Sequence, residues 1–139
     1  MRPSRRAVYG AVAAGILAAE LAIAAGVVAG PFIRGSMGDV LAVALIYFSL
    51  RAFPGLRPAT AAVVAVTTGF AVEGLQWLRV ADVLGFEAGG VLHTLVGNTF
   101  SVADLTMYVA GGAAAFAVDR SVLIPRLQSV TPEVVSESA

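Results

Sequence analysis

Long apolar runs alternate with short polar breaks along this chain. The apolar runs cover residues 7–29, 39–53, 59–78 and 102–123. Three of them approach or exceed the length of about 20 residues with which a helix crosses a hydrocarbon core of about 30 Å. The second is shorter and would have to sit within the bundle or snorkel at one end. The pattern predicts an all-α fold, a four-helix transmembrane bundle.

The breaks between the runs carry turn residues. Gly30-Pro31 ends the first run, the segment 54–58 (Pro-Gly-Leu-Arg-Pro) separates the second from the third, and Pro125 is expected to stop the fourth. Ser36 or Asp39 is expected to cap the second helix. Residues 80–100 are too polar and glycine-rich to span, yet hold several apolar side chains, which indicates an interfacial or re-entrant loop.

These breaks divide the chain into three parts. Residues 1–6 form a cytoplasmic N-terminus, residues 7–124 a single four-helix membrane domain, and residues 125–139 a polar C-terminal tail. The first run has two readings: a secretory signal peptide with Ala22-Ile23-Ala24 as its cleavage site, or a first transmembrane helix. Its length exceeds that of a usual signal sequence and favours the helix. Glu20, inside the run, must face the bundle, pair or take up a proton.

The arginines set the orientation. Seven fall on one side of a four-span bundle, namely Arg2, Arg5, Arg6, Arg51, Arg57, Arg120 and Arg126, and two on the other, Arg34 and Arg79. Basic residues concentrate on the cytoplasmic side, so both termini of this multi-pass protein are predicted to lie in the cytoplasm. Arg51 is expected to snorkel as an interfacial anchor.

Composition supports a membrane protein and excludes several classes of function. The chain is 58% hydrophobic and 13% charged, with a mean hydropathy of +0.87, whereas soluble domains carry about 25% charged residues. It has no cysteine and one histidine, so no disulfide is possible and no metal or other cofactor is expected. Its net charge of zero gives no reason to expect nucleic-acid binding.

Three acids are expected in the outer half of the bundle. Asp39 and Asp104 each begin a helix there, and Glu73 lies near the end of the third helix. Glu73 and Gln76 share a helix face, as do Asp104 and Tyr108. Arg79 is the base expected to be near enough to neutralise the group. The candidate ligand-binding residues are Asp39, Glu73, Gln76, Arg79, Asp104 and Tyr108; no catalytic residue is assigned.

Structural roles compete with functional ones at most of these positions. Glu73 and Gln76 suit a polar clamp between helices as well as a head-group, ion or proton site, and Glu73 is expected to find Arg79, a backbone donor or a proton. Asp39 and Asp104 suit helix caps. His93 and Asn98 are expected to be interface and turn residues, and Glu20 either joins the acids or faces a partner protein.

The motifs resemble a known group of small bacterial membrane proteins. Gly38-Asp39-Val40-Leu41 opens one helix, Glu73-x-x-Gln76 closes another, and residues 95–111 contain Leu-Val-Gly-x-x-Phe followed by Asp104-Leu105-x-x-Tyr108. Together they are similar to the family called domain of unknown function 2809, and more remotely to VanZ-like proteins of the cell envelope. In the first family the loop before the last helix often carries an arginine, which residues 86–93 lack. The resemblance implies a fold, a place in the bacterial cytoplasmic (inner) membrane and a set of site residues, not an activity.

Two functions follow from these features. The first is a membrane protein whose outer polar site binds a lipid head group, a cell-envelope intermediate or a cation. The alternative is a structural or accessory subunit, with a membrane-protein partner or a homo-oligomer. An enzyme is disfavoured, because no set of nucleophile, base and orienting residue is visible.

Overall fold

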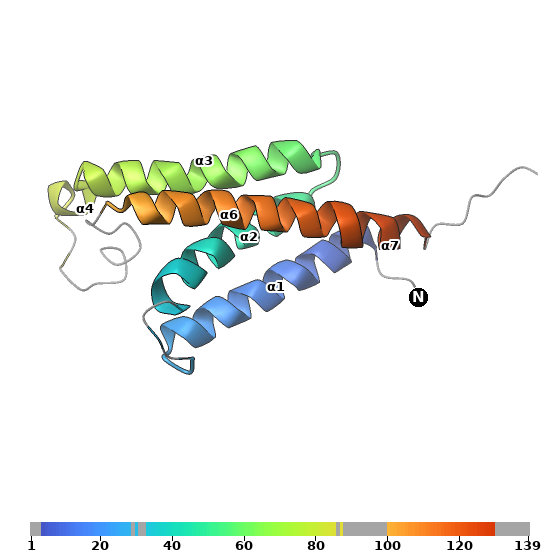
Figure 1. Cartoon of the computed structure of the whole chain (residues 1–139), viewed down its shortest axis with the longest axis horizontal. Coiled ribbons are helices and arrows are strands. Elements are labelled where there is room, and N and C mark those ends of the chain that lie inside the picture. Colours follow the sequence, from blue (N-terminus) through green and yellow to red (C-terminus); the bar gives the residue numbers. More distant parts are fainter. Residues whose placement is uncertain (1–3, 29, 31–32, 86, 88–99, 130–139) are drawn as a thin grey trace, which may run out of the picture.

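The computed structural model describes residues 4–28, 30, 33–85, 87 and 100–129, and it is all-helical over that part of the chain (Figure 1). Four helices form the bundle: α1 (Arg5–Ala24), α2 (Gly38–Arg51), α3 (Pro58–Trp77) and α6 (Val102–Val118). Shorter helical pieces join or extend them: η1 (Ile33–Met37), α4 (Val80–Val83), η2 (Asp119–Leu123) and α7 (Ile124–Ser129). The predicted four-helix arrangement is therefore confirmed at the level of its helices.

Three helical stretches in the described residues are long and apolar enough to cross a membrane. They are α1, α3 and the continuous path through α6, η2 and α7. Large apolar side chains face outward along them, with Val63, Trp77 and Val102 each about two-thirds exposed (66%, 68% and 66%). An apolar outer surface is the one that lipid requires. The chain is a membrane protein.

The short helix α2 lies at the centre of the bundle. It contacts α1 on one side and both α3 and α6 on the other, where α3 and α6 run side by side (Figure 1). Its 14 residues span about 21 Å at 1.5 Å per residue, less than a bilayer core. Four of its side chains, those of Val43, Ala44, Tyr47 and Phe48, enter the buried core. Tyr47 and Phe48 thus belong to the bundle and not to its lipid-facing surface.

Glycines allow α6 to approach its neighbours closely. A Cβ on Gly111 would lie 2.6 Å from the backbone oxygen of Val40, and one on Gly69 would lie 2.7 Å from the ring of Tyr108. Side-chain atoms do not reach such distances, so both positions need glycine. Small residues at these two positions thus allow close packing between helices inside the bundle.

Two expectations about helix ends are wrong. Neither Ser36 nor Asp39 caps α2, because the π-helical turn η1 runs directly into it, and the N-cap position is Met37 without a side-chain bond. Pro125 does not stop the last helix, since the path continues to Ser129. Pro125 lies in the first turn of α7, just after the π-helical turn η2. In a first turn the missing N–H of proline costs little.

The connection after α3 is described only in part. Arg79 adopts a left-handed backbone (φ 52°), and the single turn of α4 follows. The predicted interfacial or re-entrant loop, with His93 and Asn98, falls mostly on residues 88–99, outside the described residues. The same holds for the tail beyond residue 129.

Candidate functional site

Glu73 joins the end of α3 to the start of α6. Its side chain is buried (1% exposed). Its Oε2 accepts a hydrogen bond from the backbone N–H of Ser101 (2.9 Å), and its Oε1 accepts one from the hydroxyl of Tyr108 (3.1 Å). The expected backbone donor is therefore confirmed. The carboxyl group acts as the polar clamp that the sequence had offered as one of two readings.

Ser101 caps the N-terminus of α6, and this leaves the carboxyl group of Asp104 available for other contacts. Its Oγ accepts from the N–H of Asp104 (3.3 Å), which makes Ser101, and not Asp104, the N-cap. In a capping box the acid three residues after the cap would accept from the cap's own N–H. Here Glu73 of α3 has taken that donor. The carboxyl group of Asp104 is left to face another helix.

That helix is α2, through Asp39. The side chains of Asp39 and Asp104 lie close enough to interact, and Glu73 and Glu20 also lie within electrostatic range of Asp39. Acids held this close together repel one another when ionised, so the pair attracts a positively charged group. Both aspartates are half-buried, so a small group could reach them.

Four acids from four helices therefore meet at one end of the bundle, which we call the acid end: Glu20, Asp39, Glu73 and Asp104. Of the two possibilities left open for Glu20, the structure favours the acid cluster. Its Oε1 is shielded from solvent and has no hydrogen-bond partner among the described residues. No group of acids and histidines in the described part of the chain is arranged as a metal site.

Arg79 does not neutralise this cluster. Its Nη2 lies 2.6 Å from Oδ2 of Asp82, in an ion pair on the surface whose side chains are 71% and 41% exposed. The left-handed turn at Arg79 leads directly into α4, where Asp82 lies within reach of the Arg79 side chain. Gln76 is half-buried one turn beyond Glu73. Of the six predicted site residues the structure thus brings Asp39, Glu73, Asp104 and Tyr108 together, and it separates Arg79 from them.

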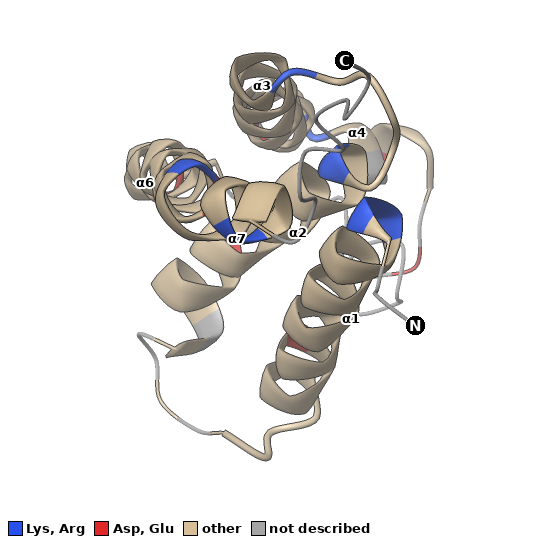
Figure 2. Ribbon diagram, turned by 90° about the vertical axis from the view of Figure 1, so that its right-hand side faces the viewer, with Lys and Arg blue, Asp and Glu red and all other residues tan. Residues whose placement is uncertain are grey.

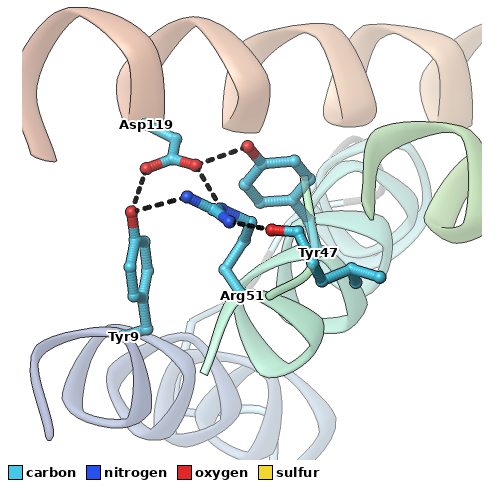
Figure 3. Close-up of polar contacts among 5 residues, drawn as sticks. Tyr9, Tyr47, Arg51 and Asp119 are labelled. Atoms are coloured by element: carbon cyan, nitrogen blue, oxygen red, sulfur yellow. Dashed lines mark hydrogen bonds and ion pairs between the residues drawn. The ribbon is translucent and has the colours of Figure 1, made fainter. Parts of the chain in front are cut away.

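A second polar cluster lies at the opposite end of the bundle, which we call the arginine end (Figure 3). Oδ2 of Asp119 accepts from Nε of Arg51 (2.6 Å) and from the hydroxyl of Tyr47 (2.7 Å), while Oδ1 accepts from the hydroxyl of Tyr9. The side chain of Arg51 also donates to the backbone oxygen of Leu56 and, over 3.1 Å, to Tyr9. We call Tyr9, Tyr47, Arg51 and Asp119 the tyrosine–arginine network.

This network corrects the interpretation of Arg51 as a snorkelling anchor. Arg51 is 2% exposed and Asp119 is fully buried. The guanidinium also lies over the ring of Tyr9, 5.0 Å from its centroid, a cation–π contact. Asp119 was assigned no role from the sequence, although it interrupts an apolar run. An acid within a spanning segment requires a partner, and that requirement was the signal that could have identified the pair.

Comparison with known proteins places the chain in a family. The family described as "Protein of unknown function (DUF2809)" matches residues 28–112, more than half of the chain. The chain belongs to the DUF2809 family. The match takes in α2, α3 and the first part of α6, and so includes all six residues proposed from the sequence. Neither a curated protein nor a solved structure matches the chain.

Membership of DUF2809 confirms the principal resemblance seen in the motifs. The more remote likeness to VanZ-like proteins stays a prediction. Because the family's description assigns no activity, the function of this DUF2809 protein has to be argued from its own geometry.

Proposed function

We propose that this DUF2809 protein is a membrane-embedded binding protein whose acid end takes a cationic group. The observation that carries the proposal is the pair of carboxyl groups on Asp39 and Asp104, which face each other from α2 and α6. An ammonium group placed between them would be attracted by both carboxyl groups.

The charge of the site selects among the ligands that the sequence suggested. Glu73 and Glu20 add two further acids in range of Asp39, and the ion pairs found among the described residues place no arginine against them. A phosphate alone would be repelled by these acids. A cation would be attracted, and the carboxyl oxygens would accept its hydrogen bonds. A lipid head group with a primary ammonium group therefore fits better than an anionic envelope intermediate.

The four residues of the site divide into two roles. Asp39 and Asp104 are half-buried and contact the ligand. Glu73 and Tyr108 are buried and already bonded to α6 or α3, so they position Asp104 rather than bind. By the arginine distribution the acid end faces the outer half of a bacterial inner membrane, with both termini in the cytoplasm.

Native mass spectrometry of the purified protein tests the proposal. Wild type would be titrated with phosphatidylethanolamine and with phosphatidylglycerol of the same acyl chains. Asp104→Asn and Asp39→Asn are the site variants. Asp82→Asn is the matched control, because it removes one acid at the same end, from the surface pair with Arg79.

We expect a discrete phosphatidylethanolamine adduct on wild type and on Asp82→Asn that both site variants lose. Equal adducts on all four proteins would refute the site. The alternative function, an accessory subunit, predicts something else. A partner protein would copurify in fixed stoichiometry from the native membrane and would be retained by both site variants.

A further inference from the structure

An open apolar groove runs along the outside of the bundle between α3 and α6. Its volume is about 470 Å³, and every side chain that lines it is apolar except that of Thr67. Ala62 and Val66 of α3 form one wall, and Val109, Ala113 and Phe116 of α6 form the other. Val109 is half exposed (50%), so the groove opens toward the surrounding membrane.

Two arginines flank the end of this groove. Arg57 directly precedes α3, two residues before the lining residue Ala59, and Arg120 follows the lining residue Phe116 by one helical turn. Both are exposed, and neither forms an ion pair within the described residues. The neighbouring acid, Asp119, is fully buried in the tyrosine–arginine network. Basic positions gather at this end of the bundle (Figure 2).

We propose that the groove and its two arginines form a site for one anionic phospholipid. An acyl chain would lie in the groove, and the phosphate would be held at the arginine end by Arg57 and Arg120. The apolar lining favours a hydrocarbon chain, and two exposed guanidinium groups favour a phosphate over an ammonium group. A partner helix would account for the groove but not for the two arginines at its end.

This site is separate from the cation site at the acid end, and the two prefer opposite head groups. α3 runs 20 residues between the two ends, or about 30 Å. Each site can therefore fail without the other. Loss of phosphatidylglycerol binding with phosphatidylethanolamine binding intact would concern only the groove.

The test is lipid binding to the full chain in detergent, measured by native mass spectrometry with phosphatidylglycerol and phosphatidylcholine of matched chains. Arg57→Gln with Arg120→Gln removes the proposed head-group contacts. Arg6→Gln with Arg126→Gln is the control, since it removes two exposed arginines elsewhere at the same end. Ala113→Phe fills the groove from its open side, and Ala110→Phe, on an exposed non-lining position of α6, is its control.

We expect phosphatidylglycerol to bind wild type in preference to phosphatidylcholine. The affinity for phosphatidylglycerol should fall about fivefold for each arginine removed from the groove's end, and Ala113→Phe should weaken binding of either lipid. Both control proteins should bind as wild type does. Equal losses in the two double variants would show a general surface-charge effect and overturn the site. Unchanged binding by Ala113→Phe would overturn the groove.

Discussion

Arg51 and Asp119 are 68 residues apart in the chain, yet Nε of Arg51 lies 2.6 Å from Oδ2 of Asp119 with both side chains shielded from solvent. The pair joins α2 to the turn that follows α6. Two tyrosine hydroxyls and a backbone oxygen complete its hydrogen bonding. Because every polar atom of the carboxylate has a donor, the pair is tolerated inside the protein.

Breaking this pair should cost more than removing it. Arg51→Met leaves an uncompensated buried carboxylate, and we expect it to lower the free energy of unfolding by about 3–5 kcal/mol. Arg51→Met combined with Asp119→Leu should recover much of that loss. SDS-induced unfolding followed by circular dichroism measures both. A double variant as unstable as the sum of its two single variants would contradict the ion-pair interpretation.

Gly111 should tolerate no side chain. In Gly111→Ala the new methyl group would meet the backbone oxygen of Val40, which cannot move without shifting α2. We expect a loss of about 1–3 kcal/mol in the same unfolding assay. Gly74→Ala is the matched control in a helix, because its Cβ would have no neighbour within 4 Å. It should be neutral or slightly stabilising, and equal effects at the two positions would argue against the close packing.

The hydroxyl of Tyr108 should matter to stability through Glu73. Tyr108→Phe removes the donor to Oε1 of Glu73 and leaves a buried acceptor unsatisfied, at a cost of about 1–3 kcal/mol. Thr106→Val deletes an exposed hydroxyl of the same helix, one that bonds only to Ala103, and should cost less. In a Glu73→Leu background the cost of Tyr108→Phe should disappear if the two side chains are coupled. A cost that is undiminished in that background would refute the coupling.

We expect α1 to remain part of the mature protein. Its Tyr9 hydroxyl bonds to both Asp119 and Arg51, and Tyr9 is fully buried. Cleavage after Ala24 would remove that partner and expose a buried ion pair. Intact-mass measurement of a C-terminally tagged protein from its native membrane decides the matter. A mass lacking the first 24 residues would favour the signal-peptide alternative.

Topology can be tested directly, because the chain has no cysteine. Single variants Ser4→Cys and Val83→Cys place a thiol before α1 and in the exposed α4. With both termini in the cytoplasm, a membrane-impermeant maleimide should label Val83→Cys in whole cells, and Ser4→Cys only after lysis. The opposite pattern would invert the orientation, and with it the side of the membrane on which each proposed lipid site lies.

The apolar runs located the helices well but could not locate the partners of the polar residues. The predicted helix 39–53 is observed as Gly38–Arg51, and the predicted helix 59–78 is observed as Pro58–Trp77. The agreement is close because the length of an apolar run largely determines the length of a membrane helix. Arg51 looked interfacial because it ends a short helix. Its burial depends on Asp119, and no local pattern relates residues 68 positions apart.

At the acid end, the acids predicted from the sequence come together, but the predicted base does not join them. Helix direction alone brings Asp39, Glu73 and Asp104 to one end. Arg79 was expected to join them because it follows Glu73 closely. The left-handed turn at Arg79 sends its side chain to Asp82 instead. A non-glycine residue in that conformation cannot be anticipated from propensity.

The central position of α2 bears on how the protein enters the membrane during synthesis. A helix of 14 residues with an acid near its first turn and an arginine at its last is a poor substrate for insertion by itself. Arg51 leaves the ribosome 68 residues before Asp119 and has no carboxylate partner until the end of the last long helix emerges. We expect α2 to stay at the membrane surface until Asp119 has been synthesised, and to insert between its neighbours after that. Formation of the tyrosine–arginine network would then be the final step of biogenesis.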